Sequence, residues 1–113
     1  MKRILVKKPW GNFKQFTLNE KSTVKILTIK PKQILSLQKH KKRKEFWYFL
    51  DNEAIVTSGN RKIKVKKNDT IIIKKGQKHR IQALSKIVSV LEISFGEFDE
   101  KDIIRFDDIY GRK

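Results

Sequence analysis

The residues best suited to chemistry in this chain are its two histidines, the only ones among 113 residues, each of which lies beside polar side chains. His40 has Gln38 two positions before it and Glu45 five positions after it, and His79 follows in a later segment. Imidazole nitrogen, carboxylate oxygen and amide oxygen together form a donor set for zinc, manganese, cobalt, nickel or iron(II). The sequence therefore predicts a single divalent metal site made of Gln38, His40, Glu45 and His79.

The elements that would carry these residues are short β-strands. Segments rich in Ile, Val, Leu, Phe and Thr alternate with turn residues such as Asn, Asp and Gly, at the spacing typical of sandwiches and barrels. Only residues 98–104 are compatible with a helical turn, which Asp99 would cap. We therefore expect an all-β, antiparallel fold, either a closed barrel or a jelly roll. The expected strands cover residues 23–30, 34–38, 45–50, 53–57, 62–66, 70–73, 79–84 and 87–93.

Strand alternation explains how the predicted ligands would meet. Residues two apart on a strand face the same side, so Gln38 and His40 share a face. A turn through residues 41–44 would bring Glu45 on the next strand back beside them, with Trp47 following on the interior face. His79 would begin a later strand, directly after a turn that contains glycine.

Length and composition restrict the class of protein. A chain of 113 residues is expected to form one domain, residues 1–113, with one modest core. The absence of cysteine excludes disulfides and thiolate metal ligands. The first apolar run ends after three residues, too short for a signal peptide, and no apolar stretch approaches the ~20 residues of a membrane span. A cytoplasmic location is the expectation.

The formal net charge of +16 invites a second interpretation, a basic β-barrel that binds nucleic acid. Two details favour a solvated surface instead. Lysine supplies 22 of the 28 basic residues, whereas base recognition favours the guanidinium of arginine. Lysines 62, 64 and 66 alternate with Ile63 and Val65, as in a strand with one face in water. We therefore expect no specific nucleic-acid partner.

A lone histidine on a strand is more often a surface or core residue than a ligand, but the spacing of this pair is informative. The pattern Gln-x-His-x4-Glu, followed by Lys-x-Gly-x2-His, resembles the two-part metal motif of cupin barrels. Residues 36–47, Ser-Leu-Gln-x-His-x-x-Arg-x-Glu-x-Trp, resemble more closely the signature of type II phosphomannose isomerases. In that family a glutamine stands in place of the first cupin histidine.

Three further segments resemble the same family in the same order. Residues 8–13 resemble its opening Arg-Pro-Trp-Gly-x-Tyr, residues 91–93 its Ile-Glu-Val strand, and residues 102–112 its terminal Asp-Ile-Val-Arg-x-Glu-Asp-x-Tyr-Gly-Arg. The resemblance implies a cupin-type double-stranded β-helix, a jelly-roll barrel, in a single domain. The family domain is often the second half of a protein that carries a mannose-1-phosphate guanylyltransferase. Because Met1 precedes the opening motif by seven residues, we expect a stand-alone module here.

The activity implied by the resemblance is a metal-dependent aldose–ketose isomerisation, in which mannose 6-phosphate and fructose 6-phosphate interconvert through an enediol, in a pathway that supplies activated mannose. Zinc is the first candidate for the metal. Arg43 matches the arginine that the family uses in catalysis. Glu92 is a candidate base, because a carboxylate facing the interior would have a raised pKa, and Lys30 is the alternative. Lys8, Arg105 and Arg112 are the candidates for binding the substrate phosphate.

The chain departs from the family pattern at position 46, where phenylalanine replaces a histidine, and also at Lys74 and Ala83. On strand alternation Phe46 faces away from Glu45, so the metal ligands are retained while a polar contact at a pocket edge or dimer interface is lost. A noncatalytic, metal-bound cupin that binds a sugar phosphate is therefore the alternative function.

Two aromatic signals complete the expectations. Phe46, Tyr48 and Phe49 lengthen an apolar run whose outer face would be covered by a second subunit, which predicts a homodimer. Tryptophan in a small barrel more often belongs to the core than to a pocket wall, so Trp10 and Trp47 are expected in the core.

Overall fold

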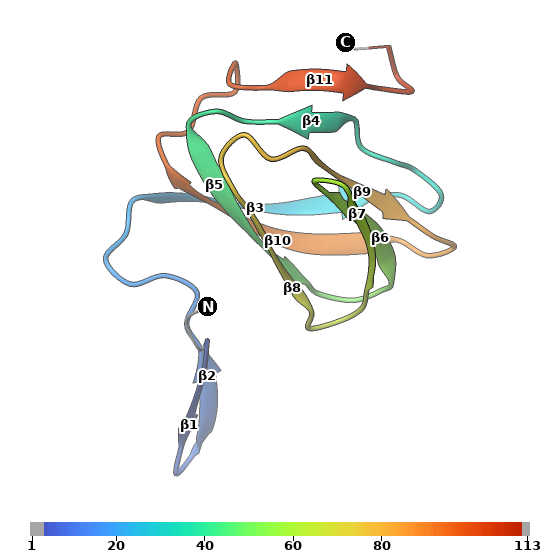
Figure 1. Cartoon of the computed structure of the whole chain (residues 1–113). Helices are drawn as coiled ribbons and strands as arrows, with labels where there is room; N and C mark the ends of the chain where they lie inside the picture. The colour runs from blue at the N-terminus through green and yellow to red at the C-terminus, as the bar shows by residue number, and fades with distance from the viewer. Residues whose placement is uncertain (1–3, 112–113) are drawn as a thin grey trace.

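The chain folds into two facing β-sheets and one separate hairpin (Figure 1). The computed structural model describes residues 4–111, and it has no helix within that range, hence none able to span a membrane. One sheet has the strand order β3-β10-β5-β8 and the other the order β11-β4-β9-β6-β7, while β1 pairs with β2. The strands are β1 (Leu5–Lys8), β2 (Gly11–Lys14), β3 (Ser22–Ile29), β4 (Leu37–Lys39), β5 (Arg43–Phe49), β6 (Ala54–Ser58), β7 (Arg61–Val65), β8 (Thr70–Ile73), β9 (His79–Ala83), β10 (Val88–Gly96) and β11 (Ile104–Asp107).

All eight strands expected from the sequence are present, with ends that differ by three residues or fewer. β4 begins late because Ile34 forms only an isolated bridge with Gln82. The sequence does not predict β1, β2 and β11, which hold four residues each and carry little apolar alternation. The segment around Asp99 forms a hydrogen-bonded turn rather than a helical one, and the Asp99 carboxylate accepts a hydrogen bond from the Lys101 amide at 3.0 Å.

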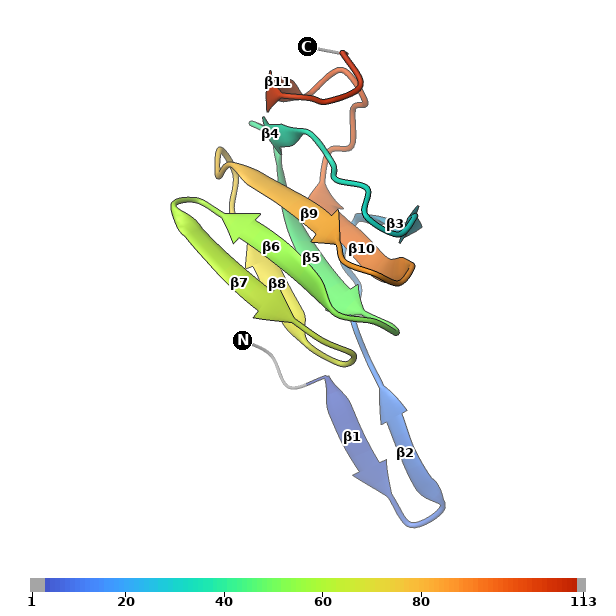
Figure 2. The same cartoon turned by 90° about the vertical axis from the view of Figure 1, so that its right-hand side faces the viewer.

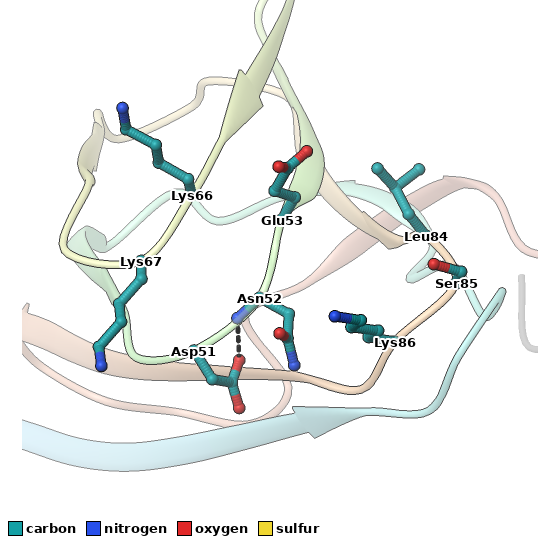
Figure 3. A pocket seen from close by; sticks show the side chains of 8 residues that line it. All are labelled: Asp51, Asn52, Glu53, Lys66, Lys67, Leu84, Ser85 and Lys86. Atoms are coloured by element: carbon teal, nitrogen blue, oxygen red, sulfur yellow. Dashed lines mark hydrogen bonds between the residues drawn. The ribbon is translucent and has the colours of Figure 1, made fainter.

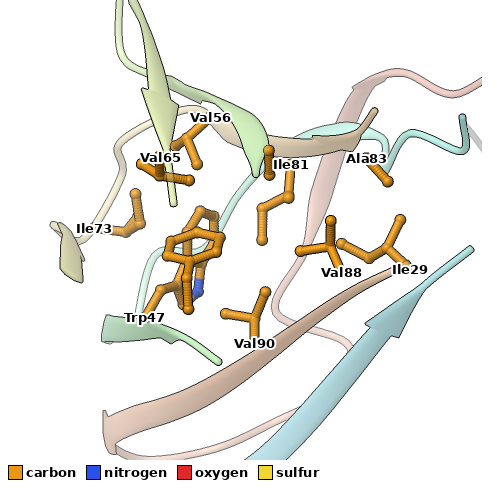
Figure 4. Packing of buried hydrophobic residues seen from close by; sticks show 11 residues of the cluster. Ile29, Trp47, Val56, Val65, Ile73, Ile81, Ala83, Val88 and Val90 are labelled. Carbon is orange, nitrogen blue, oxygen red and sulfur yellow. The ribbon is translucent and has the colours of Figure 1, made fainter. Parts of the chain in front are cut away.

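The main core lies between the two sheets. Trp47 and Phe49 point inward from β5, and Val88 and Val90 point inward from β10. Figure 4 shows the Trp47 ring among side chains from both sheets. Burial of this apolar surface, worth roughly 25 cal/mol per Å², is the main force that closes the sheets on each other. The core prediction is confirmed for Trp47 but wrong for Trp10, whose side chain is 72% exposed.

The outward face of the four-stranded sheet carries a second apolar cluster. Phe46, Tyr48 and Ile93 are buried in it, beneath Ile4 and Phe16 of the N-terminal segment. The ring centroid of Phe16 lies 6.2 Å from that of Phe46 and 5.3 Å from that of Tyr48. The chain thus covers these two aromatic residues by itself.

The expected homodimer was inferred from an apolar surface at Phe46, Tyr48 and Phe49, and the structure does not leave that surface open. Phe46 and Tyr48 are covered by the same chain, and Phe49 faces the main core on the other side of β5. None of the three therefore requires a second subunit, and a dimer must depend on other residues.

The basic strand β7 has one face in water, as its alternation indicates. Lys62 and Lys64 are exposed, whereas Val65 is buried in the core. Lys64 Nζ lies 2.9 Å from the Glu53 carboxylate, an exposed ion pair of the kind that contributes little to stability. The charge on this strand is therefore explained by solvation of an edge.

Candidate metal centre

Three predicted ligands converge at one end of the space between the sheets. His40 directly follows β4, Glu45 is the third residue of β5, and His79 is the first residue of β9. All three are buried, and one ligand atom from each lies within 4.8 Å of the others. The inward face of β5 places Glu45 there, because Trp47 two residues later anchors the same face in the core.

Each histidine is oriented by a hydrogen bond to a backbone carbonyl. Nδ1 of His40 lies 2.6 Å from the Asp102 carbonyl oxygen, and Nδ1 of His79 lies 2.9 Å from that of Gln77. A carbonyl can only accept, so each Nδ1 carries the proton and donates it. The Nε2 lone pair of each ring therefore points away from the backbone, which is how metal-binding histidines are commonly oriented. In His79 this lone pair has no hydrogen-bond partner, whereas in His40 it accepts a hydrogen bond from Nη2 of Arg43 at 3.2 Å, which a bound cation would replace.

The centre leaves two buried polar atoms without a hydrogen-bond partner. They are Nε2 of His79 and Oε1 of Glu45, which face each other at 3.5 Å, while Nε2 of His40 lies 3.7 Å from Oε2 of Glu45. Unpaired polar atoms inside a protein are costly. Burial also lowers the pKa of both histidines, which favours the neutral form that binds metal. These residues therefore fit a divalent cation.

Gln38, the fourth predicted ligand, lies beside the other three. It is the partner of His79 in the β4–β9 register, so the two side chains leave the same face of the sheet. Its Oε1 accepts a hydrogen bond from the Ser36 hydroxyl at 3.0 Å, which confirms that Ser36 and Gln38 share a side. Gln38 is thus placed to complete the set, and ligation by its amide oxygen remains a prediction.

Arg43 lies against the ligand atoms at the start of β5, rather than in the turn that was expected through residues 41–44. Its Nε donates to Oε2 of Glu45 at 3.1 Å, and its Nη2 lies 3.2 Å from Nε2 of His40. Nη1 donates to the Asp99 carbonyl at 3.3 Å, and the guanidinium carbon lies 4.5 Å from the Phe98 ring centroid. Arg43 therefore presents a buried, fixed positive charge directly beside the candidate metal site.

Glu92 faces the interior, the condition on which its predicted role depends. In the register of the four-stranded sheet it stands opposite Trp47 on one side and Lys25 on the other. Burial, and then repulsion from Glu45, raise the pKa of Glu92 to about 7. A carboxyl group with this pKa can exchange a proton near neutral pH.

The lysine near this carboxylate is Lys25, and the suggestion of Lys30 as a base is not supported. Lys30 is exposed and follows Ile29, which pairs with Val88 at the opposite end of β3. Lys25 is half-buried, and its Nζ lies 4.1 Å from the ring centroid of Phe98. Strand alternation relative to Ile29 would have placed Lys25 on the inward face, so a signal for it existed in the sequence.

The loop between β10 and β11 supports the centre from outside. The carboxylate of Asp102 accepts hydrogen bonds from the Lys41 and Lys42 amides, both at 2.9 Å, and its carbonyl holds His40. Phe98 from the same loop stacks against Arg43. No local feature of the sequence indicates these contacts, because His40 and Asp102 are separated by 62 positions.

Replacing Asp102 with alanine is expected to weaken metal binding about tenfold or more, because contacts that orient metal ligands typically have effects of this size. Two amide donors of the turn before Arg43 would lose their acceptor, and the carbonyl that orients His40 would lose its anchor. The measurement is a chelator-competition titration with zinc. Asp69→Ala is the matched control, since that carboxylate accepts from the Lys66 amide at the other end of the barrel. An unchanged affinity in folded Asp102→Ala protein would contradict this role.

The three residues predicted to bind the substrate phosphate differ in their position relative to the candidate metal centre. Arg105 on β11 is the register partner of Gln38, and its Nε is buried without a hydrogen-bond partner. It therefore leaves the same face as the candidate ligands. Lys8 is exposed on the hairpin β1–β2, which projects away from the barrel (Figure 1), so the fold does not bring it to the centre. Arg112 lies outside the described residues.

A hollow of about 400 Å³ lies elsewhere on the molecule (Figure 3). It is formed by the connections after β5, β7 and β9, and therefore lies at the opposite ends of β5 and β9 from Glu45 and His79. Its walls carry charged side chains of both signs, and none of the predicted site residues within 4–111 lines it. The lining residues are Asp51, Asn52, Glu53, Lys66, Lys67, Leu84, Ser85 and Lys86.

Comparison with known proteins identifies relatives over nearly the whole chain. Residues 2–108 match the model of a family described as "Mannose-6-phosphate isomerase C-terminal". The xanthan biosynthesis protein XanB of Xanthomonas campestris is 35% identical over 109 residues, which make up 95% of this chain and 23% of XanB. The mannose-1-phosphate guanylyltransferase ManC of Salmonella typhimurium is 34% identical over 109 residues, again 95% of this chain and 23% of the relative.

The fold itself is found in solved structures. A cupin protein from Bacteroides fragilis superposes with a TM-score of 0.63 at 21% identity, over 75% of this chain and 76% of the other. Together with the two facing sheets and the absence of helix among residues 4–111, this likeness confirms the expected cupin double-stranded β-helix.

Proposed function

The chain belongs to the mannose-6-phosphate isomerase C-terminal family, and on this premise we propose that it is a metal-dependent isomerase that interconverts mannose 6-phosphate and fructose 6-phosphate. One observation carries the proposal: Nε2 of His79 and Oε1 of Glu45 face each other at 3.5 Å, buried and without a hydrogen-bond partner. The chain covers 23% of the length of the relatives above, so what they do as whole proteins supports this activity only by analogy.

The cation would be held by His40, Glu45 and His79, with Gln38 as the fourth ligand and zinc as the first candidate. When bound, a divalent cation supplies a Lewis acid and a template for the sugar oxygens. Imidazole Nε2 atoms that are kept neutral by burial, together with one carboxylate, are the donors that such a cation requires.

The remaining interior residues have the properties that the reaction needs. Isomerisation moves one proton between C2 and C1 of the sugar and a second proton between the oxygens on these carbons, through an enediol whose oxygens gather negative charge. Glu92, with a pKa near neutrality, would remove and return the proton on carbon. Arg43 would stabilise the developing charge, because its guanidinium is fixed by three hydrogen-bonding contacts. Arg105 would bind the phosphate, and its binding energy would orient the reacting carbons.

The position of Phe46 supports the catalytic proposal over the noncatalytic alternative. Its side chain packs against Phe16 on the outward face of β5, away from Glu45. The exchange of histidine for phenylalanine therefore leaves every interior residue of the centre in place. We further propose that the protein is cytoplasmic and that it helps to supply activated mannose. Both proposals follow from the expectations drawn from the sequence and agree with a sugar-phosphate substrate.

The test is a coupled assay of fructose 6-phosphate formed from mannose 6-phosphate, using chelator-stripped protein with zinc, manganese, cobalt or nickel added back. We expect turnover only with metal, its loss in His40→Ala, and a large reduction in Gln38→Ala. Gln82→Ala is the matched control, because Gln82 is exposed on β9 and should leave the rate unchanged. Folded protein that binds metal and mannose 6-phosphate without turnover would overturn the isomerase and establish the binding protein instead.

A further inference from the structure

The hairpin β1–β2 stands apart from the rest of the molecule. Within residues 4–111 its two strands pair only with each other, and Figures 1 and 2 show it projecting beyond the barrel. It contributes to a long molecule whose principal extents are 51 × 33 × 22 Å. An isolated two-stranded hairpin is at best marginally stable in water. The hairpin would therefore be stabilised by packing against another surface.

The hairpin has an apolar side that its own barrel does not cover. Val6 and Phe13 face each other across the two strands, and Trp10 at the turn stacks on Phe13 with ring centroids 6.5 Å apart. Trp10 is 72% exposed and Phe13 is 37% exposed. Tryptophan is one of the side chains enriched among the residues that contribute most to binding at protein interfaces.

A second uncovered apolar surface lies on the outward face of β3. Val24 is 57% exposed and Ile26 is 63% exposed. In the register with β10 they stand beside Ile93 and Leu91, so they continue the outer apolar cluster toward the edge of the sheet. Phe16 and its neighbours cover the other part of this face and stop short of β3. An apolar strip formed by Val24 and Ile26 is thus left exposed.

We propose that the hairpin of one copy of this chain packs across Val24 and Ile26 of a second copy. Both uncovered surfaces belong to the same chain, so a two-fold arrangement would cover both at once, with each hairpin lying on the β3 strip of its partner. The proposal identifies the surfaces of the homodimer and is independent of the catalytic activity.

The base of the hairpin directs it away from its own β3 strip. The Gln15 amide donates to the Ile4 carbonyl at 2.8 Å, and the Lys14 ammonium contacts the Tyr48 hydroxyl. Phe16 then packs on Phe46 and Tyr48. These contacts fix the hairpin stem over β5, and the turn between β1 and β2 extends outward from the barrel (Figure 2). The partner strip is therefore reached in a second molecule rather than in the same one.

Because the chain is strongly basic, binding to a second copy and binding to an anionic partner should respond differently to salt. Two chains of net charge +16 repel each other, and Lys7, Lys8 and Lys14 lie on the hairpin itself. Apolar self-association should therefore strengthen as salt screens the repulsion. Binding of a polyanion to the same hairpin would weaken with salt. The direction of the salt dependence separates the two partners.

The first test is sedimentation equilibrium of the full chain at low and high salt. We expect a dimer that tightens with salt and whose dissociation constant rises about tenfold or more in Ile26→Glu and in Trp10→Ala. Ile87→Glu is the matched control, because Ile87 is an exposed isoleucine, 43% accessible, in the connection before β10. Circular dichroism verifies that each variant is folded. A monomer under all conditions, or a dimer unaffected by both variants, would overturn the proposal.

The second test uses the absence of cysteine from the chain. Phe13→Cys and Ile26→Cys proteins carrying different tags are mixed and treated with a short bismaleimide. We expect a cross-linked species that contains both tags. A mixed sample that gives no such species, while the dimer is present, would show that the hairpin docks elsewhere and would overturn the proposal.

Discussion

Replacing Arg43 with lysine is expected to lower kcat about 100- to 1000-fold while the metal content of the protein stays unchanged. Lysine keeps the positive charge but cannot reproduce the planar fork that contacts Glu45, His40 and the Asp99 carbonyl together. Charge develops on the substrate oxygens only as the proton leaves carbon, so the loss should appear in kcat more than in KM. Steady-state kinetics with parallel metal analysis measures both quantities.

Arg80→Lys provides the matched control for this prediction. Arg80 follows His79 on β9 and leaves the opposite face of the sheet, where its Nη1 lies 3.3 Å from Asp107. The same substitution there should change kcat only a few-fold. If metal content falls in step with kcat in Arg43→Lys, the arginine holds the ligands rather than the transition state, and the catalytic role is wrong.

The features of the centre that could be predicted from the sequence depend on the alternation of side chains along a single strand. Glu45 and Trp47 are two residues apart on one strand, so alternation places both inside. The same argument separates Phe46 from the centre, as the outer cluster confirms. His40 and His79 could be paired only through the resemblance to a known spacing, because nothing local relates two residues on different strands.

The part that the sequence did not predict depends on contacts between distant segments. Asp102 reaches His40 across 62 positions, and no periodicity encodes that approach. Trp10 looked like a core residue because tryptophan usually is, yet it lies on a hairpin outside the core. Composition reports how apolar a segment is, but not whether the same chain or another covers it.

Replacement of Glu92 is the second change for which we expect a large effect. Because Glu92 is a buried candidate base, its replacement should lower activity and raise stability. Replacing it with glutamine is expected to lower kcat about 100- to 10,000-fold, the range over which a positioned base contributes. The same change should stabilise the metal-free protein above pH 7, since glutamine removes a carboxylate whose charged form is disfavoured by burial.

The stability effect has a defined direction with pH. The folded protein holds the Glu92 proton up to a pKa of about 7, whereas the unfolded chain loses it near the ordinary value of 4.5. The stabilisation associated with that proton is therefore complete below about pH 4.5 and is lost as the pH rises through about 7, by about 3 kcal/mol at most. His40 and His79, whose pKa values are lowered, act in the opposite direction, so the informative quantity is the difference between the wild type and Glu92→Gln.

Thermal unfolding of metal-free protein at pH 5 and pH 8 measures that difference, and the pH profile of kcat/KM in the metal-loaded protein measures the base. We expect Glu92→Gln to gain stability relative to the wild type mainly at pH 8. The acid limb of the wild-type profile, near or somewhat below pH 7 because a nearby cation favours the carboxylate, should disappear in the variant. Glu53→Gln, an exposed control, should change neither measurement. A variant that keeps the acid limb would exclude Glu92 as the base, whereas a lost limb without a gain in stability would mean that Glu92 is not desolvated in the folded protein.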